Sequence, residues 1–123
     1  MSELTVARSR RAIASAVKLA FVGATLMVVV LSLLPGNDLP AVGISDKFEH
    51  IIAYAVLALL GGLAFPDATV LLAVALPALG VAMEICQLVV QGRSAEVGDA
   101  VADAIGVGLI LIPLTVLRIV QRR

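Results

Sequence analysis

The sequence is poor in aromatic and charged side chains. It has no Trp, and aromatic residues make up 3% of its 123 positions, so the aromatic belt that often anchors membrane spans is almost missing. Charged residues account for 15% and hydrophobic residues for 61%, whereas soluble domains have about 25% and 45–50%. This composition excludes an ordinary soluble domain and predicts an integral membrane protein that is anchored by its charges.

The cysteine count and the net charge exclude further classes of site and partner. Cys86 is the only cysteine, which excludes an intramolecular disulfide and any multi-cysteine metal site. Its position in an apolar run is typical of a small hydrophobic core residue. The formal net charge is zero, which argues against nucleic acid as a partner.

Four long apolar runs predict an all-α bundle of four transmembrane helices, over 12–34, 51–65, 68–90 and 100–117. The second run reaches only about 22 Å at 1.5 Å per residue, short of the hydrocarbon thickness of about 30 Å. It crosses the bilayer only if the helix already begins at Asp46. The polar turn after Asp46 is therefore expected at membrane depth.

The basic residues gather at the two ends of the chain, at Arg8, Arg10, Arg11, Lys18, Arg118, Arg122 and Arg123. The positive-inside rule then places both termini in the cytoplasm. The expected organisation is a basic cytoplasmic N-terminus over 1–11, a transmembrane domain over 12–117 and a basic cytoplasmic tail over 118–123. Most acidic residues fall at the opposite, outer ends of the spans, at Asp38, Asp46, Glu49, Glu84, Glu96, Asp99 and Asp103.

Three of the expected helices carry a polar stripe at the outer end, because residues three and four apart share a helix face. The stripes are Asp46, His50 and Tyr54; Gly80, Glu84, Gln87 and Gln91; and Asp99, Asp103 and Gly106. Ionisable groups at membrane depth are costly and normally face protein or water. We therefore expect a shared cavity that opens to the outside, with Lys47 and Arg93 at its rim.

Structural roles compete with this interpretation. Tyr54 could be a core residue, Glu84 and Gln87 could link helices, and Asp99 is expected to cap the fourth helix. Small residues are expected to let helices approach closely, at Gly61, Gly62, Ala100, Ala104 and Gly108. The Glu84 side chain is too deep and too short to reach water easily. This favours a functional cavity over a structural polar lock, a buried polar network that only holds the helices together.

The segments "DKFEHIIAYAVLALLG", "EICQ" and "GRSAEVGDAVADAIGVG" resemble the VanZ-like membrane proteins over residues 45–109. That family's pattern is Asp-Lys followed by His and Tyr at helical spacing, Glu with Gln three residues on, Arg in a short loop, and Asp followed by Asn and then Gly. The matching positions are Asp46, Lys47, His50, Tyr54, Glu84, Gln87, Arg93, Asp99 and Gly106. Asp103 stands where the family usually has Asn, so either Asp103 is protonated or the local network differs.

The resemblance implies four transmembrane helices in a bacterial cell (inner) membrane. The member that gives the family its name is associated with resistance to the glycopeptide teicoplanin, and the family supplies no agreed mechanism. Membrane lipids are the expected surroundings.

Two functions fit the residues. In the first, the protein binds or processes an anionic envelope component, lipid-linked or of peptidoglycan type. Lys47 and Arg93 would hold the anion. His50, oriented by Asp46 or Glu84, would be the group that takes up or releases a proton. If chemistry occurs, His50 and Glu84 are the candidate acid/base pair.

The remaining candidates for ligand binding are Tyr54, Gln87, Asp99 and Asp103. The Asp/Glu/His cluster could instead hold a divalent cation, although no residue is assigned as a metal ligand. In the second function, the protein is a non-enzymatic assembly or permeability factor, and its buried polar network only fixes the helix register.

Overall fold

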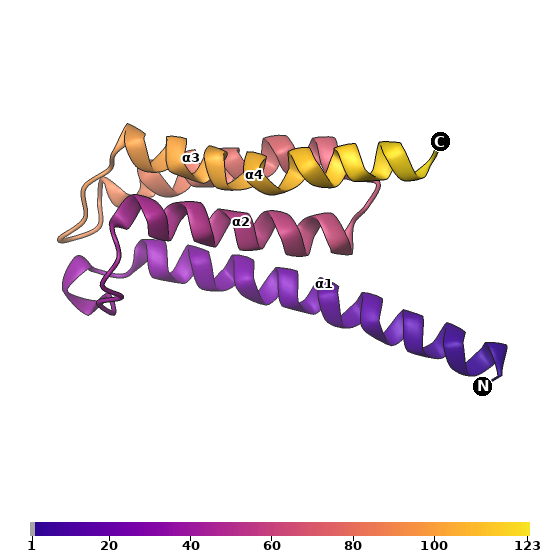
Figure 1. The fold of residues 1–123 in the computed structure, drawn as a ribbon. Helices are drawn as coiled ribbons and strands as arrows, with labels where there is room; N and C mark the ends of the chain where they lie inside the picture. Colours follow the sequence, from indigo (N-terminus) through magenta and orange to yellow (C-terminus); the bar gives the residue numbers. More distant parts are fainter. Residues whose placement is uncertain (1) are drawn as a thin grey trace.

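The computed structural model describes residues 2–123 and consists of helices joined by short connections (Figure 1). The elements are α1 (Glu3–Leu33), the 3-10 turn η1 (Gly36–Asp38), α2 (Asp46–Ala64), α3 (Thr69–Gln87) and α4 (Val97–Gln121). The four α-helices are each long and apolar enough to cross a membrane. The expectation of an all-α bundle with four such helices is confirmed.

The start of α2 agrees with the length argument made from the sequence. The helix begins at Asp46, after Ser45 in an extended conformation, and runs for 19 residues. At about 1.5 Å per residue this gives roughly 28 Å, close to the hydrocarbon thickness. The polar first turn of α2 therefore belongs to a helix that is long enough to cross a bilayer.

Two helices extend further than the apolar runs. In α1 the helix already begins at Glu3, where the Ser2 hydroxyl accepts a hydrogen bond from the Thr5 N–H, so the basic segment is helical from Glu3 onward. In α4 the helix continues to Gln121 and includes Arg118. By contrast, α3 ends at Gln87, before the end of its apolar run.

In the bundle, α2 lies between α1 and α4, and α1 diverges from the other helices toward its N-terminus (Figure 1). Both chain termini lie at one end of the bundle, here called the terminal end (Figure 1). The connections over residues 34–45 and 88–96 lie at the opposite end, here called the loop end (Figure 1). They touch each other, since the Gly36 N–H donates to the Gln91 carbonyl at 3.1 Å.

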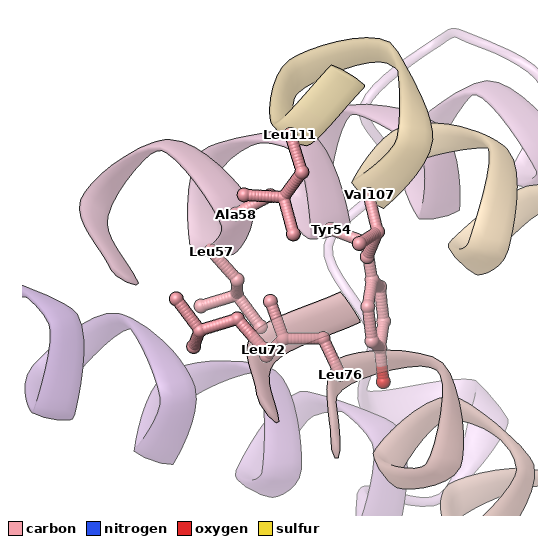
Figure 2. Close-up of a cluster of buried hydrophobic side chains, with 7 residues drawn as sticks. All are labelled: Tyr54, Leu57, Ala58, Leu72, Leu76, Val107 and Leu111. Atoms are coloured by element: carbon pink, nitrogen blue, oxygen red, sulfur yellow. The ribbon is translucent and has the colours of Figure 1, made fainter. Parts of the chain in front are cut away.

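The apolar core lies among α2, α3 and α4 (Figure 2). Its buried members are Tyr54, Leu57, Ala58, Leu72, Leu76, Val107 and Leu111. Phe21 and Val28 of α1 also pack against this core. Most other large apolar side chains are exposed on the outside of the bundle, as expected for helices that face lipid.

The helices α2 and α4 approach each other closely at Gly106. A Cβ atom at this position would collide with the backbone carbonyl of Ile51. The expectation that Ala104 and Gly108 let helices approach closely is wrong, because Ala104 is exposed and no atom of another helix lies within 4 Å of a Cβ built at Gly108. The face of α4 that meets α2 is the face of Asp99, Asp103 and Gly106, which places the polar stripe and the helix contact together.

Arg118 stabilises the turn between α2 and α3 at the terminal end. Its guanidinium donates hydrogen bonds to the carbonyl oxygens of Gly62 and Pro66 and to the Thr69 hydroxyl. The Lys18 ammonium lies 5.6 Å from the centre of the Phe65 ring in the same region. Arg118 therefore caps carbonyls at the end of α2, in addition to contributing positive charge to this end.

Candidate functional site

The polar stripes of α2 and α4 meet through His50 and Asp103. The His50 Nδ1 atom lies 2.8 Å from the Asp103 Oδ1 atom, and Asp103 is only 1% exposed. The third helix makes room for this carboxylate, because a Cβ atom at Gly80 would collide with the Asp103 Oδ2 atom. Three helices thus enclose one His–Asp pair.

Asp99, one turn nearer the loop end than Asp103, forms the second part of the site. Its Oδ1 atom accepts a hydrogen bond from the Lys47 Nζ atom at 2.9 Å, and its Oδ2 atom lies 4.0 Å from the His50 Nε2 atom. Lys47 also donates to Glu96 Oε2 at 2.9 Å. The ammonium of Lys47 is therefore shared between two carboxylates.

The expected role of Asp99 as a helix cap is wrong. The N-cap position of α4 is Glu96, whose side chain makes no capping hydrogen bond, and Asp99 lies inside the first turn. The Asp99 carboxylate turns toward α2 because Lys47 and His50 supply its partners there.

Glu84 binds the backbone just before α4 and does not pair with His50. Its Oε2 atom accepts the Glu96 backbone N–H at 2.8 Å, and the side chain is 7% exposed. Within residues 2–123, no hydrogen bond or ion pair joins His50 to Glu84 or to Asp46. The orienting partner of His50 thus differs from the two that were expected and is Asp103.

Gln87 connects α3 to the end of α1. It is 2% exposed, and its Nε2 atom donates to the Ser32 carbonyl at 3.2 Å. This geometry corresponds to the helix-linking role considered for Gln87.

Two buried polar atoms at the site have no hydrogen-bond partner among the described residues, the Tyr54 hydroxyl and Glu84 Oε1. Tyr54 is 2% exposed and extends from the core toward α3 (Figure 2). Buried polar groups in proteins nearly always have a partner, which can be ordered water or a ligand. These two atoms therefore mark a place where a further polar group would fit.

A cavity of about 170 Å³ lies beside this cluster, between α1, the connection to α2, and α2 itself. Val28, Leu31 and Leu39 contribute apolar walls, and Arg93 reaches it from the connection between α3 and α4. Its polar side includes Asp46, Glu49, His50 and Tyr54. The cavity is therefore amphipathic, with apolar and polar walls.

All nine predicted site residues lie toward the loop end, but in different roles. Lys47, His50, Asp99 and Asp103 form one connected cluster, with Glu84 joined to it through Glu96. Asp46, Tyr54 and Arg93 line the cavity, and Gln87 lies against α1. Residue spacing did not identify Glu96 as a partner of Lys47, since it lies in a connection with no helical periodicity.

Asp46, His50 and Asp99 have a geometry that could hold a metal ion, with one ligand atom from each lying within 4.8 Å of the others. The arrangement can also hold an anion through Arg93, whose side chain makes no hydrogen bond or ion pair within the described part of the chain. Comparisons of the chain with protein-family models, curated proteins and solved structures find no match.

Proposed function

We propose that the protein is a VanZ-like multi-pass protein of a bacterial inner membrane that binds an anionic, lipid-linked envelope component at its loop end. Four spanning helices and the gathering of the VanZ-like motif residues at one end support this proposal. Any link to glycopeptide resistance would follow from such binding.

The observation that carries the proposal is the amphipathic cavity with Arg93 at its edge. Lys47, the other cation expected to hold an anion, is already neutralised by Glu96 and Asp99. Arg93 is therefore the group that would pair with a phosphate, which a guanidinium can bind through two hydrogen bonds. The apolar walls from Val28, Leu31 and Leu39 would receive the first part of the lipid chain.

Binding of a polyprenyl phosphate to the detergent-solubilised protein tests the proposal. We expect Arg93→Ala to weaken binding by about 10- to 100-fold, since a hydrogen bond to a charged group contributes about 1.5–3 kcal/mol. Native mass spectrometry or microscale thermophoresis would measure the dissociation constant.

Arg123→Ala is the matched control, because it removes the same charge from the exposed terminal end and should leave the affinity unchanged. Equal affinities for the wild type and Arg93→Ala would refute the proposed anion site.

The same proposal places the loop end outside and both termini in the cytoplasm, since the basic residues flank the terminal end. Asn37 and Ser94 are exposed in the two loop-end connections. In a background with Cys86 replaced by Ser, cysteines at these positions should react with an impermeant thiol reagent added to intact cells. Reaction of a cysteine at Arg123 under the same conditions would contradict this orientation.

A structural polar lock is the second candidate, and one observation favours it. Lys47, His50, Glu84 and Gln87 all have partners within the protein. Such a lock would fix helix register in a non-enzymatic assembly or permeability factor. It would predict no dependence of lipid binding on Arg93, so the same titration separates the two candidates.

A further inference from the structure

His50 has the orientation of a metal ligand. Its Nδ1 atom is engaged by the Asp103 carboxylate at 2.8 Å, which leaves Nε2 directed to the side of Asp99 Oδ2, 4.0 Å away. Metal-binding histidines typically donate their second ring N–H to a carboxylate in this way, which fixes the ring and raises its basicity. Asp103 is itself held between α2, α3 and α4, with Gly80 against its carboxylate.

Two further oxygen ligands lie beside Nε2. Ligand atoms of Asp46, His50 and Asp99 are all within 4.8 Å of one another. Around an ion with bonds of about 2.0–2.2 Å, tetrahedral ligand atoms are separated by roughly 3.3–3.6 Å. The three ligand atoms therefore need to move only slightly closer together. The Asp46 side chain can do this by rotation, because it is exposed on the first turn of α2.

From this geometry we propose that Asp46, His50 and Asp99 bind a divalent first-row transition-metal ion, Mn²⁺ or Zn²⁺. Imidazole combined with carboxylates suits these ions better than Mg²⁺ or Ca²⁺, which prefer oxygen ligands alone. Lys47 holds only Oδ1 of Asp99, so Oδ2 remains available to the metal.

The buried Tyr54 side chain lies one helical turn from His50 on α2. Tyr54 is 2% exposed, its hydroxyl has no hydrogen-bond partner among residues 2–123, and the residue borders the cavity that Asp46 and His50 also line. Three protein ligands leave at least one coordination position open, as in catalytic zinc sites. A water or a phosphate oxygen would occupy that position.

The metal also gives the proposed anion site a favourable charge. The cavity is lined by the carboxylates of Asp46 and Glu49 and by one fixed cation, Arg93. A divalent cation reverses the local charge balance and attracts a phosphate. This role of the metal rests on the proposed function, whereas the presence of the metal does not.

Metal binding is measured on the full chain in detergent, after removal of metals with EDTA and dialysis, by Mn²⁺ titration followed by electron paramagnetic resonance and by Zn²⁺ titration calorimetry. We expect saturable binding of one ion per chain. Asp46→Asn should weaken it at least about tenfold, and Asp103→Asn by about 10- to 100-fold through the orientation of His50.

Asp38→Asn is the control, because it removes an exposed carboxylate at the loop end that lies outside the cavity. It should bind Mn²⁺ as the wild type does. Asp46 has no hydrogen-bond partner in the part of the chain that the structure describes, so Asp46→Asn tests the site without a loss of folding.

The proposal is overturned if the wild type binds no ion, if Asp46→Asn binds as the wild type does, or if Asp38→Asn loses binding to the same extent. Saturable metal binding without binding of polyprenyl phosphate would support the cation site and refute the proposed function. Binding of polyprenyl phosphate that does not change when EDTA is added, with no metal bound, would support the proposed function and refute the cation site.

Discussion

Replacing Gly106 with leucine is expected to destabilise the bundle by about 3 kcal/mol or more. A Cβ atom at this position would collide with the Ile51 carbonyl and crowd the Ala55 backbone N–H. These neighbours are backbone atoms of α2, which cannot rotate away as a side chain can, so α2 and α4 must separate. Unfolding by SDS in mixed micelles, followed by circular dichroism, would measure the loss.

Gly108→Ala is the matched control on the same helix. No atom of another helix lies within 4 Å of a Cβ built at Gly108, and alanine in a helix is favoured over glycine by about 0.5–1 kcal/mol. We expect a neutral or slightly stabilising effect. Wild-type stability of Gly106→Leu would mean that α2 and α4 do not pack through this glycine.

Gly106 also couples packing to the polar site. It lies about one turn from Asp103 on the face of α4 that meets α2. Separation of the helices at Gly106 should therefore lengthen the contact between His50 and Asp103 and weaken Mn²⁺ binding. The control Gly108→Ala should keep both properties.

Length and periodicity predicted the elements of this fold because both are local properties. The run over 51–65 was too short to cross a bilayer unless the helix started at Asp46, where α2 does begin. Residues at spacing three and four share a helix face in any tertiary context. The stripes of His50, Glu84 and Asp103 also lie at one end of the bundle, as their positions near the ends of the apolar runs predicted.

The partners within the site could not be predicted from spacing. They depend on the rotation and relative height of whole helices. Glu84 lies at the level where α4 begins and accepts the Glu96 N–H, which leaves Asp103 as the partner of His50. The cavity against α1 was not foreseen either, because its walls from Val28 and Leu31 carry no polar pattern.

His50→Ala is expected to destabilise the protein by about 3–5 kcal/mol, because it leaves the Asp103 carboxylate buried without its partner. Asp103 is 1% exposed and its hydrogen bond in the structure is to His50. SDS titration in mixed micelles would measure the change in unfolding free energy. Glu49→Ala, on the same turn of α2, removes a side chain that has no hydrogen-bond partner within residues 2–123, and should cost much less.

The double change His50→Gln with Asp103→Asn separates a functional site from a structural lock. Two neutral amides can keep a hydrogen bond between α2 and α4, so the stability should return to within about 1 kcal/mol of the wild type. The imidazole ligand and its carboxylate partner are both lost, so we expect a folded protein that binds neither Mn²⁺ nor polyprenyl phosphate with wild-type affinity. Full binding by this variant would instead assign the His50–Asp103 pair to helix register alone, since an amide pair can replace a lock but cannot replace a metal ligand.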